Sequence, residues 1–150
     1  ARRGCSPAAM SYRQQKNKVM LTDVCVPVSR LAQCIAESEA DTHAEGIPCI
    51  ICAHIADGNF HCLIPYQEHD LARVKKLEDK IIKRSLAFGG TVSGEHGVGV
   101  GKMQHILEEH GREYINLMRR IKKALDPNSI MNPDKIFTLA EDDGPKLSKL

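Results

Sequence analysis

Two short stretches of the sequence hold side chains that could do chemistry together. His54 and His61 flank the turn signal D-G-N, so a hairpin would bring their rings together across adjacent strands. A Gly-rich stretch, residues 89–101, holds Glu95 and His96 side by side at its centre. Two imidazoles and a carboxylate suit a divalent transition metal that keeps open positions for a substrate. His96 would then stand beside the metal as a base.

Either stretch alone is open to a structural explanation, because a histidine pair across a hairpin is often a packing feature. The Gly-rich stretch is not a phosphate cradle of a known kind. Met103 follows Lys102 where the P-loop requires a hydroxyl, and the glycine spacing does not fit the dinucleotide-binding fingerprint. The two stretches together favour a metal-plus-base site over coincidence.

The elements that must position these side chains alternate along the chain. Strands are predicted over 18–28, 47–55 and 60–65, with a short edge strand at 91–93. Helices are predicted over 29–45, 68–88 and 102–110, and from Arg112 to just before Pro127. The order β-α-β-β-α-(β) is that of a ferredoxin-like layer. We therefore expect an α+β fold, a ferredoxin-like antiparallel sheet with helices packed on one face, plus C-terminal helices.

The composition suits one globular domain, since 42% of the 150 residues are hydrophobic and 27% are charged. A net charge of +2 and 4% aromatic residues give no basis for nucleic-acid binding. No apolar run has the length of a membrane span. We divide the chain into a basic segment 1–17, expected to be poorly ordered, a globular part 18–137 and a polar tail 138–150. Because the chain begins with an Arg-rich segment rather than Met, we expect a piece of a longer protein.

The six cysteines are expected to be free thiols in a reducing compartment. Cys49 and Cys52 match C-x-x-C, but they lie in a predicted strand, where their side chains point to opposite faces. That arrangement suits neither a redox pair nor a shared metal site.

Three motifs occur in an order and at distances that resemble a known family. They are H-x-x-D-G-N-x-H at 54–61, S-G-E-H-G-V-G at 93–99 and M-N-P-x-K at 131–135. The pattern resembles the C-terminal half of FAD-linked D-2-hydroxyacid dehydrogenases, the D-lactate dehydrogenase (cytochrome) and glycolate oxidase group. Residues 22–31 look most like the D-lactate members.

This resemblance implies a vanillyl-alcohol-oxidase-type flavoprotein in which an N-terminal domain binds FAD. The present chain would supply the ferredoxin-like cap and the C-terminal helical segment that close the substrate site. His54, His61 and Glu95 match the family's metal ligands, usually for zinc. His96 matches the base that takes the substrate's hydroxyl proton.

The resemblance also assigns two residues outside the metal cluster. Arg2 falls where the family places an arginine that clamps the substrate carboxylate, and Asn132 matches a residue near the flavin ring. Ala56 and Asp134 stand where the family usually has glycine. Either change could alter a turn, but neither removes a ligand.

The implied function is the oxidation of D-lactate to pyruvate with hydride transfer to FAD, and the piece alone is expected to be inactive. Leu63 is apolar where 2-hydroxyglutarate enzymes carry an amide, which favours a small apolar substrate. The alternatives are a glycolate or D-2-hydroxyglutarate dehydrogenase of the same family, or a non-enzymatic metal-binding module. The sequence does not identify the electron acceptor.

The chain ends Ser148-Lys149-Leu150, which at a true C-terminus is a peroxisomal address read by an import receptor. We therefore expect a peroxisome or glycosome, with the mitochondrion as the alternative.

Overall fold

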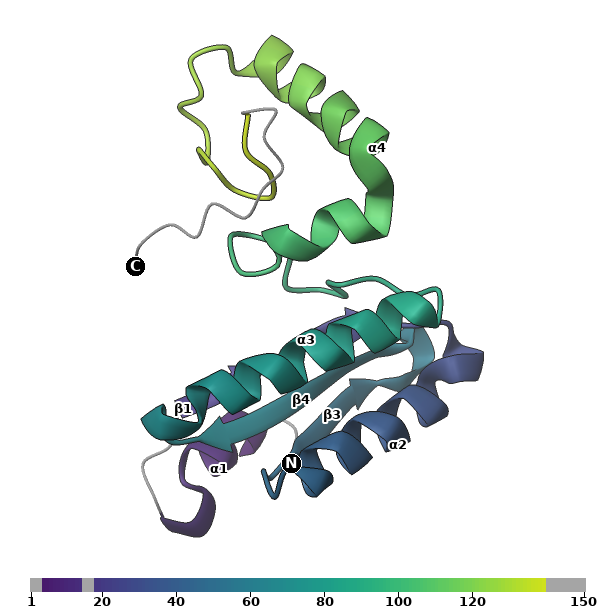
Figure 1. The fold of residues 1–150 in the computed structure, drawn as a ribbon, viewed down its shortest axis with the longest axis vertical. Coiled ribbons are helices and arrows are strands. Elements are labelled where there is room, and N and C mark those ends of the chain that lie inside the picture. Colours follow the sequence, from purple (N-terminus) through teal and green to yellow (C-terminus); the bar gives the residue numbers. More distant parts are fainter. Residues whose placement is uncertain (1–3, 15–17, 140–150) are drawn as a thin grey trace. The chain divides into compact units, whose positions relative to one another are not determined.

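The computed structural model describes residues 4–14 and 18–139. The chain divides into two compact units, Ala1–His96 and Gly97–Leu150 (Figure 1). The first unit contains three helices, α1 (Cys5–Met10), α2 (Val28–Ala44) and α3 (Leu71–Ala87). Its strands are β1 (Lys18–Leu21), β2 (Val24–Cys25), β3 (Ile50–His54) and β4 (Asn59–Tyr66). The second unit is built on α4 (Met103–Leu125).

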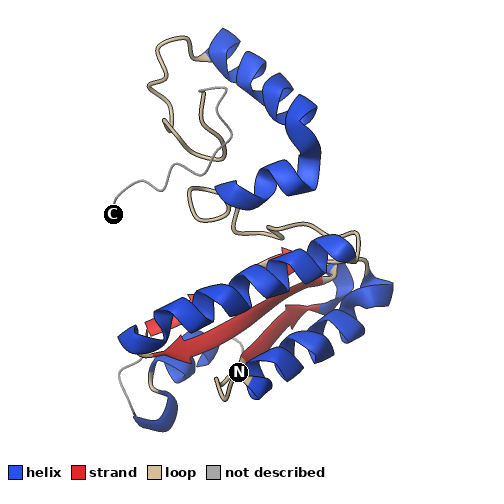
Figure 2. Cartoon of the chain, viewed as in Figure 1, coloured by secondary structure: helices blue, strands red, loops and turns tan. Residues whose placement is uncertain are grey.

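Strand β4 is the centre of an antiparallel sheet (Figure 2). It pairs with β3 on one side and with β1 and β2 on the other. β1 and β2 lie end to end in one register, because Leu21 pairs with Leu63 and Val24 pairs with Phe60. The predicted strand over 18–28 is therefore interrupted at two residues, Thr22 and Asp23.

The fourth strand position of a ferredoxin-like layer is reduced to one bridge. Thr91 exchanges backbone hydrogen bonds with Cys25, where the sequence predicts an edge strand at 91–93. Helices α2 and α3 lie on the same face of the sheet (Figure 1). The predicted α+β fold, an antiparallel sheet with helices packed on it and a further helix after it, is confirmed.

Alternation along β4 separates the face that packs against the helices from the face that carries His61. Phe60, Cys62 and Ile64 are completely buried, and Cys62 contacts Cys49, which also contacts Thr42 of α2. Because strand side chains alternate, His61 points to the face opposite α2.

The predicted apolar stripe of α3 completes the core on the packing face. Val74, Leu77, Ile81 and Ile82 are all buried, whereas Leu71 at the helix start is half-buried. The spacing of these residues places them on one side of an α-helix, as the sequence predicts.

The cysteines behave as the strand pattern predicts. Cys52 pairs with His61 across the sheet and so shares its face, whereas Cys49 contacts Cys62 on the other face. The five cysteines Cys25, Cys34, Cys49, Cys52 and Cys62 are free. The hydrogen bond from Cys62 to Cys49, together with burial, raises the pKa of the Cys62 thiol, so this thiol stays protonated.

Several helix boundaries differ by a few residues from those predicted, and one short helix was not predicted. α2 begins at Val28 rather than Ser29, and Pro27, with φ −50° and ψ 136°, occupies the cap position. The helix Cys5–Met10 was not predicted, because its few apolar residues show no helical period. Ala9 of this helix is nevertheless fully buried, and the helix contacts β1, β3 and β4.

The second unit confirms a predicted break between two helical segments. α4 departs from helical geometry at Gly111, where φ is 78° and ψ is 163°. The helix ends at Leu125, and the carboxylate of the next residue, Asp126, accepts the N–H groups of Ile130 and Met131. The Lys122 ammonium pairs with Asp126 and, with these N–H groups, lowers the pKa of that carboxyl group. None of the helices in the described part of the chain is long and apolar enough to cross a membrane.

A cluster of ion pairs connects α2 to α3. The guanidinium of Arg84 donates to Glu37 at 3.0 Å, and it also pairs with Asp41. Lys80 donates to the other Asp41 oxygen at 2.5 Å. Burial raises the pKa of Asp41, but the hydrogen bonds from Lys80 and Arg84 outweigh it, so the pKa lies below its usual value.

We expect Asp41→Asn to lower the free energy of unfolding by about 1–2 kcal/mol at pH 7, because Arg84 and Lys80 lose a charged acceptor. A carboxyl whose folded-state pKa is depressed stabilises fully above its unfolded pKa, about 3.9 for Asp. The difference between wild type and variant should therefore shrink as the pH falls below about 4.

Urea unfolding at several pH values measures this difference. The exposed pair of Asp79 with Lys83 provides the control, and Asp79→Asn should change the free energy by less than about 0.5 kcal/mol. An Asp41→Asn effect that stayed constant from pH 7 to pH 2 would contradict the assignment.

Candidate functional site

The hairpin of β3 and β4 brings His54 and His61 onto one face of the sheet. His54 is the cross-strand partner of Asn59, so His61, two residues further along β4, is its diagonal neighbour. The ring centroids of the two histidines lie 5.9 Å apart. The turn between the strands is a 3-10 helix, Ile55–Asp57, followed by Gly58. Ala56 fits this helical turn, so the departure from the family's glycine is tolerated.

Glu95 joins the two histidines. Its Oε1 atom lies 2.9 Å from Nε2 of His61 and 3.0 Å from Nε2 of His54. Potential ligand atoms of these three residues all lie within 4.8 Å of one another. The three predicted ligands are thus brought together from β3, β4 and the Gly-rich stretch.

The hydrogen bonds of His61 indicate which of its two ring nitrogens carries the proton. Nδ1 of His61 lies 3.0 Å from the Thr22 carbonyl oxygen, which can only accept, so Nδ1 carries the proton. In the neutral ring, Nε2 then presents a lone pair towards Oε1 of Glu95. Two acceptor atoms 2.9 Å apart require a proton or a cation between them, and this donor set therefore fits a metal ion.

The electrostatics of Glu95 agree with a cation-binding role. Burial raises the pKa of Glu95, but the contacts with His61 and His54 lower it by more, so that this pKa lies below its usual value. The carboxyl group is therefore ionised at neutral pH and able to act as a ligand.

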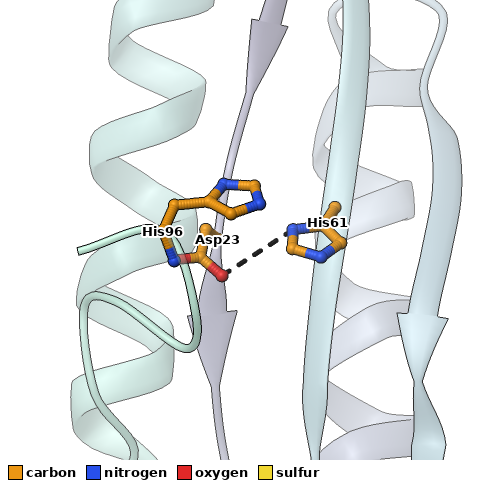
Figure 3. Close-up of side chains that lie close together, drawn as sticks. All are labelled: Asp23, His61 and His96. Atoms are coloured by element: carbon orange, nitrogen blue, oxygen red, sulfur yellow. Dashed lines mark hydrogen bonds and ion pairs between the residues drawn. The ribbon is translucent and has the colours of Figure 1, made fainter. Parts of the chain in front are cut away.

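His96 lies beside this cluster. Its ring stacks on that of His61, with centroids 4.8 Å apart and an angle of 8° between the planes (Figure 3). Nε2 of His96 is 3.8 Å from Oε1 of Glu95. The His96 side chain is half exposed, so a small molecule could reach it while contacting the cluster.

Asp23 was not among the predicted site residues, although it belongs to the site. Its side chain is 1% exposed. Its carboxylate accepts the N–H groups of Glu95 and His96 at 3.1 and 2.9 Å, and the Ser93 hydroxyl at 2.9 Å. The available signal was an acid inside an apolar strand pattern, where a carboxylate without hydrogen-bonding partners is costly.

Asn59 and Gly94 fit closely behind the Glu95 turn. A Cβ atom on Gly94 would lie 2.4–2.8 Å from the Asn59 amide group, so only glycine fits without a shift. Asn59 is 5% exposed. Among the side chains that the structure describes, its Oδ1 is the buried polar atom with no hydrogen-bond partner.

The two remaining predicted residues are not tested by this geometry. Arg2 lies outside the described residues. Asn132 belongs to the second unit, where it is exposed and adopts a positive φ of 47°. Asp134, at a position where the family usually has glycine, has a φ of 54°, a conformation that Asp tolerates better than most residues.

Comparison with known sequences identifies the class of protein. Residues 1–136 match the family described as FAD linked oxidases, C-terminal domain, and the chain belongs to this family.

Individual relatives are more specific. The chain is 43% identical over 137 residues to a Danio rerio protein named probable D-lactate dehydrogenase, mitochondrial. The aligned region covers 89% of this chain and 27% of the relative. A Saccharomyces cerevisiae protein named D-lactate dehydrogenase [cytochrome] 1, mitochondrial, is 45% identical over 83% of this chain and 22% of its own length. The corresponding Arabidopsis thaliana protein is 44% identical over 81% of this chain and 22% of its own length. The chain thus spans about a quarter of the length of these relatives.

The predicted peroxisomal or glycosomal location is wrong. The three relatives are all named as mitochondrial, which points to the mitochondrion. The peroxisomal prediction depended on Ser148, Lys149 and Leu150, which lie outside the described residues. The signal consists of three residues, whereas the similarity to the mitochondrial relatives extends over more than a hundred residues and outweighs it.

We expect Gly94→Ala to lower the free energy of unfolding by about 1–3 kcal/mol, because its Cβ must displace the Asn59 amide. Urea unfolding measures the loss. In an Asn59→Ala background the same change should cost much less, since the clashing atoms are gone.

Gly101→Ala is the matched control, because a Cβ there would meet no atom within 4 Å. Equal costs of Gly94→Ala in the two backgrounds would contradict the close fit of Gly94 against Asn59.

Proposed function

We propose that this chain is the substrate- and metal-binding part of an FAD-dependent D-lactate dehydrogenase that oxidises D-lactate to pyruvate. The observation that carries the proposal is the convergence of His54, His61, Glu95 and His96, in a family of FAD-linked oxidases. The relatives' names supply the substrate. Because the chain spans about a quarter of those relatives, the FAD-binding part is assigned to the remainder of such an enzyme.

His54, His61 and Glu95 are proposed to hold a divalent metal, with zinc as the first candidate. The proton on Nδ1 of His61, fixed by the Thr22 carbonyl, supports this role because it directs the Nε2 lone pair into the cluster. Three protein ligands are typical of a catalytic site that keeps a position open for substrate.

Oxidation of a 2-hydroxy acid removes a proton from the hydroxyl and a hydride from the α-carbon, leaving a carbonyl group. When bound, the metal acts as a Lewis acid that lowers the pKa of the substrate hydroxyl, and FAD accepts the hydride. His96 is proposed to take the hydroxyl proton, because its ring lies beside the ligand cluster and is half exposed.

Three further residues receive roles that their positions in the family motifs support. Arg2 would bind the substrate carboxylate, and Asn132 would lie near the flavin ring. Leu63 is buried and apolar, and it lies on the same face of β4 as His61, two residues further along. A second substrate carboxylate beside this side chain would be desolvated without a partner, which favours D-lactate over D-2-hydroxyglutarate. The mitochondrial names of the relatives support a mitochondrial location.

Elemental analysis tests the metal site. The purified chain should carry about one zinc or similar divalent ion, and His54→Ala/His61→Ala should lose it because two of three ligands are removed. The matched control is His43→Ala/His69→Ala, which removes two exposed histidines outside the site and should keep the metal. Equal metal content in the two double variants would remove these residues from the ligand set.

Flavin reduction tests the proposed reaction. In the enzyme that carries its FAD-binding part, D-lactate should reduce the flavin faster than D-2-hydroxyglutarate does. His96→Ala should slow reduction by D-lactate by about 100- to 10,000-fold, because the general base is missing. Metal content should be unchanged, which separates loss of the base from loss of the metal. Near-normal reduction by the His96→Ala enzyme would sink the assignment of the base.

A further inference from the structure

We infer that Asp23 is a positioning residue whose buried carboxylate fixes the turn 93–96, so that Glu95 and His96 both face His61. The inference rests on the proposed roles of Glu95 and His96 in binding the metal and removing the proton. It assigns Asp23 no direct contact with substrate or metal.

Each residue of the turn 93–96 donates a hydrogen bond to Asp23. Its Oδ2 accepts the Ser93 hydroxyl and the His96 N–H, each at 2.9 Å. The Glu95 N–H lies 3.1 and 3.2 Å from the two carboxylate oxygens. The backbone carbonyl of Asp23 accepts the Gly94 N–H at 3.3 Å. One residue therefore positions the backbone from which both functional side chains extend.

The interruption of the strand at Thr22 and Asp23 also orients His61. Thr22 donates its N–H to the Cys62 carbonyl, and its hydroxyl, rather than its carbonyl, accepts the Cys62 N–H at 2.9 Å. The Thr22 carbonyl thereby becomes available to Nδ1 of His61. Two adjacent residues, Thr22 and Asp23, consequently place three of the four proposed functional side chains.

Burial of Asp23 makes the loss of any of these hydrogen bonds costly. Asp23 is 1% exposed, so water cannot replace a lost partner. A carboxylate is suited to this position because it is acceptor-only and can take several N–H and O–H donors at once. An amide in its place would turn an N–H₂ group towards the N–H donors of Glu95 or His96.

A different role for Asp23 follows if the metal binds elsewhere. Asp23, His61 and His96 also form a group that could hold a metal ion. Two contacts argue against this arrangement. Nδ1 of His61 is 3.8 Å from Oδ1 of Asp23 (Figure 3). The same nitrogen is already directed at the Thr22 carbonyl, 3.0 Å away. The Asp23 oxygens are occupied by donors from the turn, whereas Oε1 of Glu95 faces both His54 and His61.

The first test is the Zn²⁺ affinity of Asp23→Asn, measured on the 150-residue chain by competition with a chromophoric chelator. We expect affinity to fall by about 10- to 100-fold, as for other residues that orient metal ligands. Asp57→Asn makes the same chemical change on an exposed residue of the same hairpin and should leave affinity unchanged. Ser93→Ala removes one donor but keeps both N–H bonds, so it should lower affinity only a few-fold.

The second test reads the turn directly and does not depend on a variant that folds. In the folded wild-type chain, amide hydrogen exchange at Glu95 and His96 should be slowed because both N–H groups donate to a buried carboxylate. Exchange of either amide at the rate of an unprotected one would overturn the inference.

The outcomes separate this inference from the proposed function. A wild-type chain that binds no metal would contradict the proposed function, while amide protection would still report on the turn. A folded Asp23→Asn chain with wild-type Zn²⁺ affinity would overturn the positioning role and leave the proposed function standing. Full affinity in His54→Ala would place the metal on Asp23, His61 and His96, and would overturn the inference in favour of a ligand role.

Discussion

The site depends on one buried carboxylate located at a gap in the sheet. A continuous strand over 18–25 would direct the Thr22 carbonyl into the ladder with β4. Because the strand is interrupted, that carbonyl accepts from His61 instead, and Asp23 takes four donors from the turn at 93–96. The sheet keeps its register across the gap, since β1 and β2 pair with β4 in the same frame. Thr22 and Asp23 thus lie outside the regular strand pairing, and the paired strands on either side fix their positions.

The alternation of β4 explains how one strand can serve both a packed core and a polar site. Phe60, Cys62 and Ile64 lie on the face that packs against helices, and the thiol of Cys62 is held protonated by burial and by Cys49. His61 lies between two of these buried residues and points the other way. Its backbone is therefore fixed by the packing of its neighbours, which limits the movement of a side chain whose two nitrogens both have partners.

Much of this arrangement could be predicted from the sequence, because it follows from local patterns. The period of α3, the hairpin that brings His54 and His61 together, and the break at Gly111 each depend on residues close in the chain. The gap at Thr22 and Asp23 could not be predicted in this way. Residues 18–28 are mostly apolar, and the partners that keep Asp23 buried come from about seventy residues later. The short helix at Cys5–Met10 was missed because its stability comes from contact with the sheet rather than from a helical pattern of its own.

The glycine content of residues 89–101 does not by itself reveal the structural role of this stretch. A run of glycines suggests either mobility or a cradle for phosphate, yet Gly90 and Gly94 serve close packing. A Cβ atom on Gly90 would lie 2.2 Å from the carbonyl oxygen of Cys25, beside the Thr91 bridge that closes the sheet edge. A Cβ on Gly94 would collide with the buried Asn59 amide. Glycine at these two positions lets the chain approach the sheet closely enough for Asp23 to reach the N–H groups of Glu95 and His96. Residues 90–94 are therefore closely packed against the sheet, and the hydrogen bonds from the Glu95 and His96 N–H groups to Asp23 hold the turn from which both side chains face His61.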